Sequence, residues 1–364
     1  MKGASVSERA PTIHDVAREA SVSTATVSRV LNGGTVRADT AAAVHDAVRR
    51  LGYLPNRVAR GLVTGRTDVV GVLVPDLVGP LNAAVARGVE DALEARGLHA
   101  VVTTDHRDAR RERARMRSLL ARRVDGLVLI GSQLHDDAIR ATVGTTPVVH
   151  VGAEREPDPH DDPIPEVRVD NRAGIDATLR LLARAGHVRI AHLAGPRRDG
   201  RERETAVHDE ARALGLDLVA CRSADFSEEG GRDAGHALLE RGGFSAVVCA
   251  NDRCAVGLYA AARERGLRLP DDLSVVGFDD LPWSAYLDPA LTTVRHPSRE
   301  MGRLAAERLF AVDAKDAWSG IRTLSPDLIE RASVTSPSSP IPAPAGAART
   351  SAHPPYLARK EDHP

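Results

Sequence analysis

The sequence predicts a small all-α head followed by a large α/β body built on parallel sheets. Within the first 51 residues, apolar residues recur at spacings of three and four, which is typical of short amphipathic helices. From residue 69 onward, short β-branched runs alternate with amphipathic helical segments. This alternation indicates parallel sheets with helices on both faces. The chain of 364 residues is long enough for two or three domains.

The head begins with two short predicted helices. Thr12 and Asp15 fit a capping box at the start of the first helix. The apolar stripe of this helix consists of Ile13, Val16, Ala17 and Ala20. Ser23 is the expected N-cap of a second helix, Thr24–Leu31, because its hydroxyl can accept a hydrogen bond from a free backbone amide.

A third helix is expected from about Asp39 to Leu51, where Gly52 ends it. Two short helices joined by a tight turn and covered by a third predict a helix-turn-helix, whose second helix fits the major groove of DNA. A three-helix bundle with another role is the alternative on this pattern alone.

Charge is distributed unevenly along the chain. The first 66 residues contain ten basic and five acidic residues, whereas the remainder contains 39 basic and 45 acidic residues. A basic head on an acidic body indicates a polyanionic partner at one end, with an ordinary solvated surface as the alternative.

Several protein classes are disfavoured by the composition. No apolar run reaches the roughly 20 residues of a membrane span, and the first 11 residues lack a secretory apolar stretch. The three cysteines have no metal-type spacing. We therefore expect a cytoplasmic protein with no membrane contact, no metal and no cofactor.

The body is predicted as alternating strands and helices. The expected strands are 69–74, 100–103, 126–130, 148–151, 190–193, 246–249 and 274–277. The expected helices are 83–95, 111–122, 173–185, 201–213, 232–239 and 253–265. Parallel sheets of this kind bind ligands at the carboxyl ends of their strands. Residues 154–165, rich in Pro and Asp, predict an exposed loop between two halves of the body.

Two segments carry a resemblance to a known family. Residues 12–32, TIHDVAREASVSTATVSRVLN, closely resemble the DNA-binding head of the LacI/GalR family of bacterial transcriptional regulators. Residues 51–62, LGYLPNRVARGL, resemble the hinge of that family. The resemblance extends from about Thr12 to Ser333 and implies a helix-turn-helix head, a hinge helix and a periplasmic-binding-protein-like body of two doubly wound subdomains that close over a small molecule.

The resemblance implies specific contacts with DNA. Base edges would be read by Thr24, Ala25 and Arg29. The phosphate backbone would be held by Ser23, Thr26, Ser28, Tyr53, Asn56 and Arg57. Leu62 matches the hinge leucine that wedges into the minor groove. Two departures weaken the match, because Arg37 replaces a capping serine and Gly61 costs the hinge helix about 1 kcal/mol relative to alanine.

The same resemblance implies the domain limits. The head would span residues 1–51, the hinge 52–67 and the body 68–335. The N-subdomain would comprise about 68–165 plus 296–325, and the C-subdomain about 166–294 plus 326–335. Residues 336–364, rich in Pro, Ser and Ala, are expected to be a disordered tail. The tail has no leucine heptads, so we expect a homodimer rather than a tetramer.

Four residues match the effector-binding positions of the family: Asp279 in VVGFDD, Asn251 in AND, Phe226 and Arg201. Arg203 is the alternative to Arg201, because the loop after Pro196 is interpreted as about two residues short.

Three departures from the family pattern bear on the ligand. Leu81 and Ser298 stand where relatives have aromatic residues, and Gly152-Ala153 replaces a common Asp-Arg pair. The loss of two stacking surfaces disfavours a flat purine and favours a sugar-like ligand.

These features predict a homodimeric repressor that binds a pseudo-palindromic operator and responds to a small effector. A solute-binding protein and an enzyme are the alternatives from other classes. The basic head argues against the first. The absence of a phosphate loop, metal spacing or nucleophile elbow argues against the second. Activation instead of repression, and induction instead of co-repression, stay open.

Overall fold

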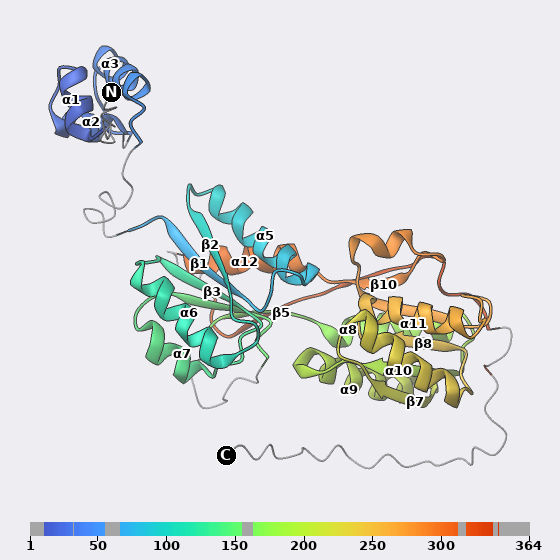
Figure 1. The fold of residues 1–364 in the computed structure, drawn as a ribbon. Coiled ribbons are helices and arrows are strands. Elements are labelled where there is room, and N and C mark those ends of the chain that lie inside the picture. The colour runs from blue at the N-terminus through green and yellow to red at the C-terminus, as the bar shows by residue number, and fades with distance from the viewer. Residues whose placement is uncertain are drawn as a thin grey trace, which may run out of the picture. The chain divides into compact units, whose positions relative to one another are not determined.

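The computed structural model describes residues 11–31, 33–54, 66–154, 163–311, 318–337 and 341. The chain divides into two compact units, residues 1–68 and 69–364 (Figure 1). Each unit has a hydrophobic core of its own.

The head consists of three helices, as predicted: α1 (Ile13–Glu19), α2 (Thr24–Leu31) and α3 (Ala38–Leu51). Their inward faces form one core of Val16, Ala17, Val27, Val30, Val44, Ala47 and Tyr53. The expected caps are present, because the Thr26 amide donates to Ser23 Oγ (3.1 Å) and the Thr12 amide donates to Asp15 Oδ2 (2.9 Å). The side chain of Arg37 makes no capping bond to α3, in agreement with the expectation.

The body contains two six-stranded sheets. The first has the order β11-β5-β4-β3-β1-β2, and every described pairing in it is parallel. Its strands are β1 (Val69–Val74), β2 (His99–Thr104), β3 (Gly126–Ile130), β4 (Val148–Val151), β5 (Glu166–Val169) and β11 (Ile321–Leu324).

The second sheet has the order β12-β10-β9-β8-β6-β7, and its described pairings are parallel except for that of β12 with β10. Its strands are β6 (Arg189–Ala194), β7 (Asp217–Ser223), β8 (Ala246–Cys249), β9 (Ser274–Asp279), β10 (Thr292–Arg295) and β12 (Asp327–Ile329).

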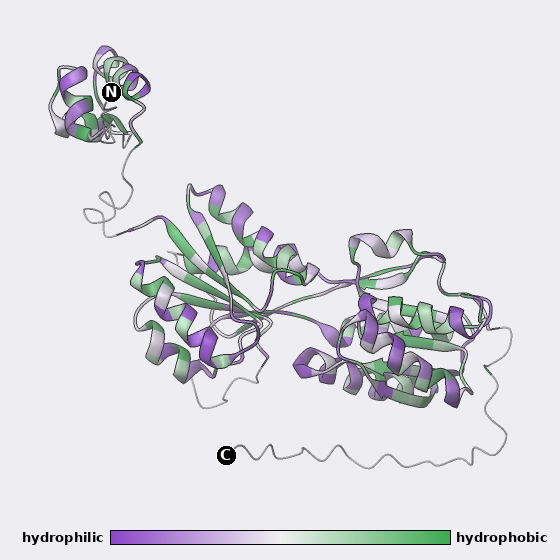
Figure 2. Ribbon diagram, viewed as in Figure 1, coloured by the Kyte–Doolittle hydropathy of each residue, from purple (hydrophilic) through white to green (hydrophobic). Residues whose placement is uncertain are grey.

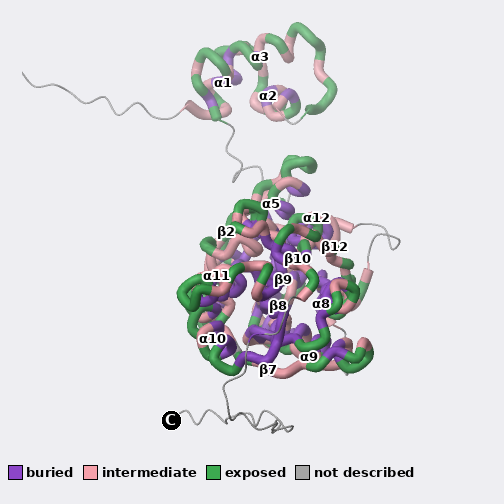
Figure 3. The backbone as a smooth tube through the Cα atoms, turned by 90° about the vertical axis from the view of Figure 1, so that its right-hand side faces the viewer, coloured by how far each residue is buried: buried purple, intermediate pink, exposed green. Residues whose placement is uncertain are grey.

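Helices cover both faces of each sheet (Figure 1). Helices α5 (Pro80–Glu94) and α12 (Ser298–Leu309) cover one face of the first sheet. Helices α6 (Ala109–Ala121) and α7 (Asp136–Val143) cover the other. In the second sheet, α8 (Asn171–Arg184) and α9 (Arg197–Leu214) cover one face. Helices α10 (Glu228–Arg241) and α11 (Asp252–Glu264) cover the other. A short 3-10 helix, η1, spans Pro282–Tyr286. The inner strands are hydrophobic and buried, whereas β2, β11 and β12 at the sheet edges are partly exposed, and the outer helix faces are hydrophilic and exposed (Figures 2 and 3). We call the two layered halves the first lobe and the second lobe.

The sequence-predicted strands and helices are present. The bounds of β1, β3, β4 and β8 are those predicted, and one or both ends of the other predicted elements of the body are shifted by one to four residues. β5, β7, β10, β11, α7 and α12 were not among the predicted elements. The first crossing between the lobes was placed too early, because β5 pairs with β4 and β11 in the first sheet and the chain crosses at Asp170. The described chain crosses again between β10 and α12 and between β11 and β12.

The ordered body continues past the predicted boundary at residue 335. Ile341 is buried in the core of the second lobe. Its amide donates to the carbonyl of Phe244 (2.9 Å), and its carbonyl accepts from the amide of Gly243 (2.6 Å). Because two backbone bonds and an apolar side chain hold this residue, the predicted tail begins too early.

Two glycines allow α5 and α12 to pack closely. A Cβ on Gly88 would lie 1.9 Å from the carbonyl oxygen of Arg299, and a Cβ on Gly302 would lie 2.0 Å from that of Val85.

We predict that Gly88→Ala lowers the free energy of unfolding of the body by about 1–3 kcal/mol, because backbone must move to admit the methyl group. Urea denaturation measures this. Ala83→Ser, on the exposed side of α5, is the matched control, and equal effects of the two variants would contradict the close contact.

Candidate functional site

A cavity of about 180 Å³ lies between the two lobes of the body. Loops that follow β1, β3 and β4 line it from the first lobe, and residues at the ends of β8 and β9 line it from the second. It therefore lies at the carboxyl ends of both parallel sheets, where ligands bind in such folds. The first lobe contributes most of the apolar lining: Leu81, Val85, Ile130, Val151, Val169 and Met301. The second lobe contributes many of the polar groups, so the cavity has an apolar and a polar side.

Asp279 is the most unusual polar residue of the cavity. It ends β9 with a φ of 127°, a conformation that strains any residue with a side chain. Its carboxylate is buried, and Oδ1 has no hydrogen-bond partner among the described residues. Burial raises the pKa of Asp279 well above its ordinary value, against the opposing effect of Arg203. A buried acceptor without a donor is costly, so a ligand hydroxyl here would satisfy it.

Asp252 holds the loop that carries Asp279. This carboxylate is fully buried and accepts hydrogen bonds from the Leu281 amide (2.8 Å), the Ser284 hydroxyl (2.6 Å) and the Thr293 hydroxyl. Burial raises the pKa of Asp252 to about 6, although all three donors oppose the shift. Its contacts connect α11, η1 and β10, which makes Asp252 a positioning residue that sequence reasoning missed.

Arg203, the alternative, lines the cavity, and Arg201 does not. The buried guanidinium of Arg203 donates to Asn171 Oδ1 (2.8 Å) and to the Ala250 carbonyl (2.7 Å), and it lies 3.6 Å from the centre of the Phe278 ring. Arg201 lies away from the cavity because α9 begins directly after Pro196. Residues two apart on a helix point to opposite sides, so the inward position of Arg203 turns Arg201 toward solvent.

Asn251 and Phe226 both line the cavity. Asn251 caps α11 through Oδ1, which accepts from the Cys254 amide (2.9 Å), and its Nδ2 donates to the Phe226 carbonyl (3.2 Å). The Phe226 ring packs on Gly195, where an added Cβ would lie 2.0 Å from the ring. The guanidinium of Arg197 lies over this ring at 5.0 Å.

His296 is a cavity residue that the sequence reasoning missed. It lies at the second crossing between the lobes, and its Nδ1 is 2.7 Å from Ser298 Oγ. Burial, assisted by Arg203, lowers the pKa of His296 to about 4, so the ring is neutral at physiological pH. Ser298, singled out because it replaces an aromatic residue, thus orients the imidazole. Leu81 and Gly152, two of the other departures, line the cavity directly.

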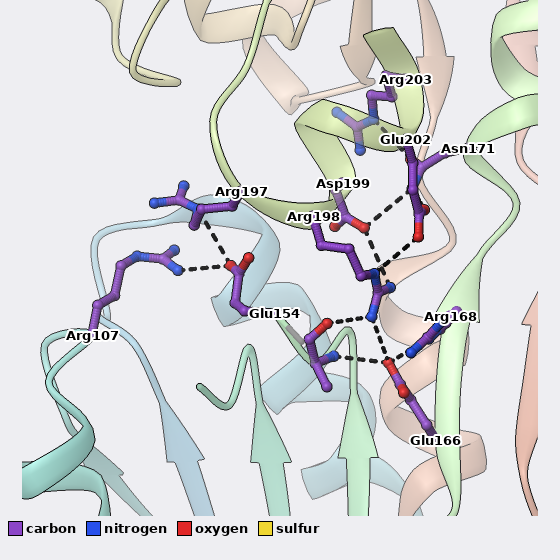
Figure 4. A network of polar contacts seen from close by, with 11 residues as sticks. Arg107, Glu154, Glu166, Arg168, Asn171, Arg197, Arg198, Asp199, Glu202 and Arg203 are labelled. Atoms are coloured by element: carbon purple, nitrogen blue, oxygen red, sulfur yellow. Dashed lines mark hydrogen bonds and ion pairs between the residues drawn. The ribbon is translucent and has the colours of Figure 1, made fainter. Parts of the chain in front are cut away.

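Arginine side chains join the two lobes beside the cavity (Figure 4). Arg198, at the start of α9 in the second lobe, donates to the Ala153 carbonyl and to Glu166 Oε1 (3.1 Å) of the first lobe. Only 3% of its side chain is exposed. Burial opposes ionisation of Glu166, but Arg168 and Arg198 together hold its pKa below the ordinary value. We call the contacts of Arg198 with Ala153 and Glu166 the interlobe latch.

A second set of ion pairs lies next to the latch. Glu154 of the first lobe pairs with Arg107 (3.2 Å) of the same lobe and with Arg197 (3.3 Å) of the second. Neither set was predicted, although the sequence offered a signal in the two consecutive arginines after Pro196 and in the acids that flank the boundary loop.

In the head, α2 exposes part of its predicted reading face. Ala25 and Arg29 are exposed, whereas Thr24, Thr26 and Ser28 are half-buried. The hydroxyls of Ser23 and Thr26 are 2.9 Å apart. Tyr53 is only 8% exposed and belongs mainly to the head core. The predicted contacts Asn56, Arg57 and Leu62 lie outside the described residues.

Family models match both units of the chain. Residues 12–56 match the model "Bacterial regulatory proteins, lacI family", and residues 179–334 match "Periplasmic binding protein-like domain". Catabolite control protein A of Priestia megaterium is 33% identical over 306 residues, which cover 82% of this chain and 91% of that protein. The chain belongs to the LacI family.

Solved structures of LacI-family regulators share the fold. The lac repressor dimer bound to operator and the anti-inducer ONPF has a TM-score of 0.81 at 28% identity, covering 90% of this chain and all of that one. The complex of the transcriptional regulator CelR with cellobiose has a TM-score of 0.64 at 30% identity, covering 89% of this chain and all of that one. The protein is accordingly a transcriptional regulator and not an enzyme. No helix among the described residues is long and apolar enough to span a membrane.

We predict that Arg203→Met destabilises the body by about 2–4 kcal/mol, because two buried acceptors lose their donor. Arg201→Met should change the free energy of unfolding by less than about 0.5 kcal/mol, as expected for an exposed side chain. Urea denaturation followed by circular dichroism compares the two variants. Equal destabilisation would contradict the assignment of Arg203 as the inward arginine.

Proposed function

We propose that this LacI-family regulator is a homodimeric repressor whose operator affinity is set by a neutral, sugar-like effector bound between the lobes. The observation that carries the effector class is the buried Oδ1 of Asp279, which has no hydrogen-bond donor among the described residues, in a cavity whose opposite side is apolar. A sugar ring presents hydroxyl groups on its edge and C–H groups on its face, which complements both sides.

The charges of the cavity support a neutral ligand. Arg253 forms a bidentate pair with Glu228 (2.9 and 2.6 Å). Arg197 shares Glu154 with Arg107, and Arg198 is bound in the latch. Arg203 donates to an amide and a carbonyl oxygen. Because these guanidinium groups already have acceptors, a phosphorylated or carboxylate ligand would have to displace existing ion pairs. The structural neighbour CelR, solved with cellobiose, is consistent with this class.

For DNA recognition we propose that α2 enters the major groove, with Thr24, Ala25 and Arg29 reading bases and Ser23, Thr26, Ser28 and Tyr53 positioning the backbone. The proposed DNA contacts of Asn56, Arg57 and Leu62, which lie outside the described residues, rest on the sequence alone. Homodimer formation is supported by the edge strand β2, whose Val101 and Val102 are 40% and 41% exposed. A two-fold dimer would match a pseudo-palindromic operator.

We predict that Arg29→Ala weakens operator binding by about 1–3 kcal/mol, because a guanidinium that contacts a base edge is lost. A gel shift with the DNA upstream of the protein's own gene measures the change. Arg18→Ala removes an equally charged residue from the exposed side of α1 and serves as the control. If Arg29→Ala and Arg18→Ala bind operator alike, α2 does not read bases through Arg29.

We predict that Asp279→Asn abolishes the response of operator binding to sugars while ligand-free operator affinity stays within about twofold of wild type. Screening neutral pentoses, hexoses and disaccharides by calorimetry, then repeating the gel shift with the sugar that binds, tests this. Asp217→Asn, at an exposed site on β7, is the control. A retained response in Asp279→Asn would show that the effector binds elsewhere, and tight purine binding without sugar binding would overturn the effector class.

A further inference from the structure

Helix α6 of the first lobe carries an unusual surplus of positive charge. Residues 107–123 contain eight arginines and two acids, although the body as a whole is acidic. Six of these arginines are exposed, and the four that lie within the helix define what we call the α6 face: Arg110, Arg111, Arg115 and Arg117. The opposite side of the helix packs on the sheet through Met116 and Leu119.

The arginines of the α6 face have no ion-pair partner within the described structure, and neither does Arg113 beside them. Many arginines on other helices of the body have carboxylate partners, although Arg212 of α9 and Arg263 of α11 have none among the described residues. Arg180 pairs with Asp176 (2.8 Å) and Arg232 with Glu264 (3.0 Å). Helix α6 differs in that all five of its arginines lack a carboxylate partner among the described residues, so its surplus of charge is more than the arginine-rich composition of the chain.

The two acids of the segment do not neutralise this face. Glu112 is 2% exposed and turns inward, where it accepts from the Ser132 hydroxyl and from the Gln133 amide (3.1 Å). The Asp108 carboxylate caps the helix by accepting from the backbone amides of Arg110 (2.8 Å) and Arg111 (2.9 Å). Neither acid therefore neutralises the exposed guanidinium groups of α6.

The chemistry of the face favours the phosphate backbone of duplex DNA as its partner. Apart from arginine, the exposed residues of α6 are the alanines 109, 114 and 121. Protein interfaces need buried aromatic or apolar anchors, and single-stranded nucleic acids need aromatic rings for stacking; this face offers neither. A rigid row of guanidinium groups, such as Arg111 and Arg115 one turn apart, suits a line of phosphates.

The position of α6 in the chain supports the same partner. The helix ends just before β3, and the amide of Asp125 there donates to the carbonyl of Val69 at the start of β1 (2.7 Å). The C-terminal end of α6 thus lies at the edge of the first lobe where the chain arrives from the DNA-binding head. In the sequence, the head directly precedes the strand β1 that begins at this edge.

We propose that the α6 face is a second, sequence-independent contact site for the phosphate backbone of duplex DNA. This contact lies outside the helix-turn-helix and would strengthen binding to any duplex. It would also make that binding more sensitive to salt, because each neutralised phosphate releases condensed counterions.

The test uses the full chain and a duplex of about 30 base pairs that lacks the operator. Fluorescence anisotropy gives the binding constant as a function of KCl concentration. The variant Arg111→Gln/Arg115→Gln/Arg117→Gln removes three charges from the α6 face. The control Arg180→Gln/Arg232→Gln/Arg268→Gln removes three arginines that have carboxylate partners elsewhere. Thermal melts of both variants check that the fold is intact.

We expect the α6 variant to reduce the slope of log K against log salt by about 2–3, since each phosphate contact contributes about 0.9. The control should keep the wild-type slope. Equal slopes and affinities for the two variants would overturn the contact with DNA. If the α6 variant then still lost repression in cells, the α6 face would bind an acidic protein instead of DNA. A wild-type chain that binds no duplex would overturn both this contact and the proposed function. If the α6 variant keeps the wild-type slope while Arg29→Ala loses operator binding, the α6 contact fails and the proposed function of the head stands.

Discussion

The closed arrangement of the body depends on one buried arginine. Arg198 belongs to the second lobe, where its Nε donates to Glu202 (3.0 Å), but its Nη1 donates to Ala153 and Glu166 of the first. A buried guanidinium is stable only while its partners stay in place, so the lobes cannot separate without exposing or orphaning these groups. The latch therefore fixes the shape of the cavity. Breaking these contacts would distinguish an open state from the latched one, and an effector needs two such states in order to shift an equilibrium.

The cavity combines a rigid frame with one unsatisfied group. Asp252, Asn251 and Arg203 are each bonded to neighbouring elements, so they hold β8, β9 and α9 in register. Asp279, by contrast, keeps a buried oxygen with no donor among the described residues, at a strained backbone position. The unsatisfied oxygen and the strained backbone destabilise the ligand-free body locally. A hydroxyl-bearing ligand enclosed by both lobes would remove the penalty of the unsatisfied oxygen.

Much of the architecture could be predicted from sequence, because periodicity and caps are local signals. Val69–Val74 and Ser23 illustrate this for a strand and a cap. β5 and β11 escaped prediction because short strands at a lobe boundary take their identity from partners distant in the chain. Arg201 was preferred to Arg203 because a loop length was misjudged, and an error of two residues reverses the face of a helix. The latch joins residues 32 and 45 positions apart, which no local pattern reveals.

The central claim is that a solute between the lobes and DNA at the head are coupled through this latched body. Linkage makes the claim measurable, because the factor by which a sugar changes operator affinity must equal the factor by which operator changes sugar affinity. The decisive measurement is a thermodynamic cycle on the full chain. Anisotropy gives the operator affinity with and without the sugar, and calorimetry gives the sugar affinity with and without operator. The account predicts two equal factors that differ from one, and their collapse toward one in Arg198→Met. A sugar that binds the cavity while operator affinity stays constant would contradict it.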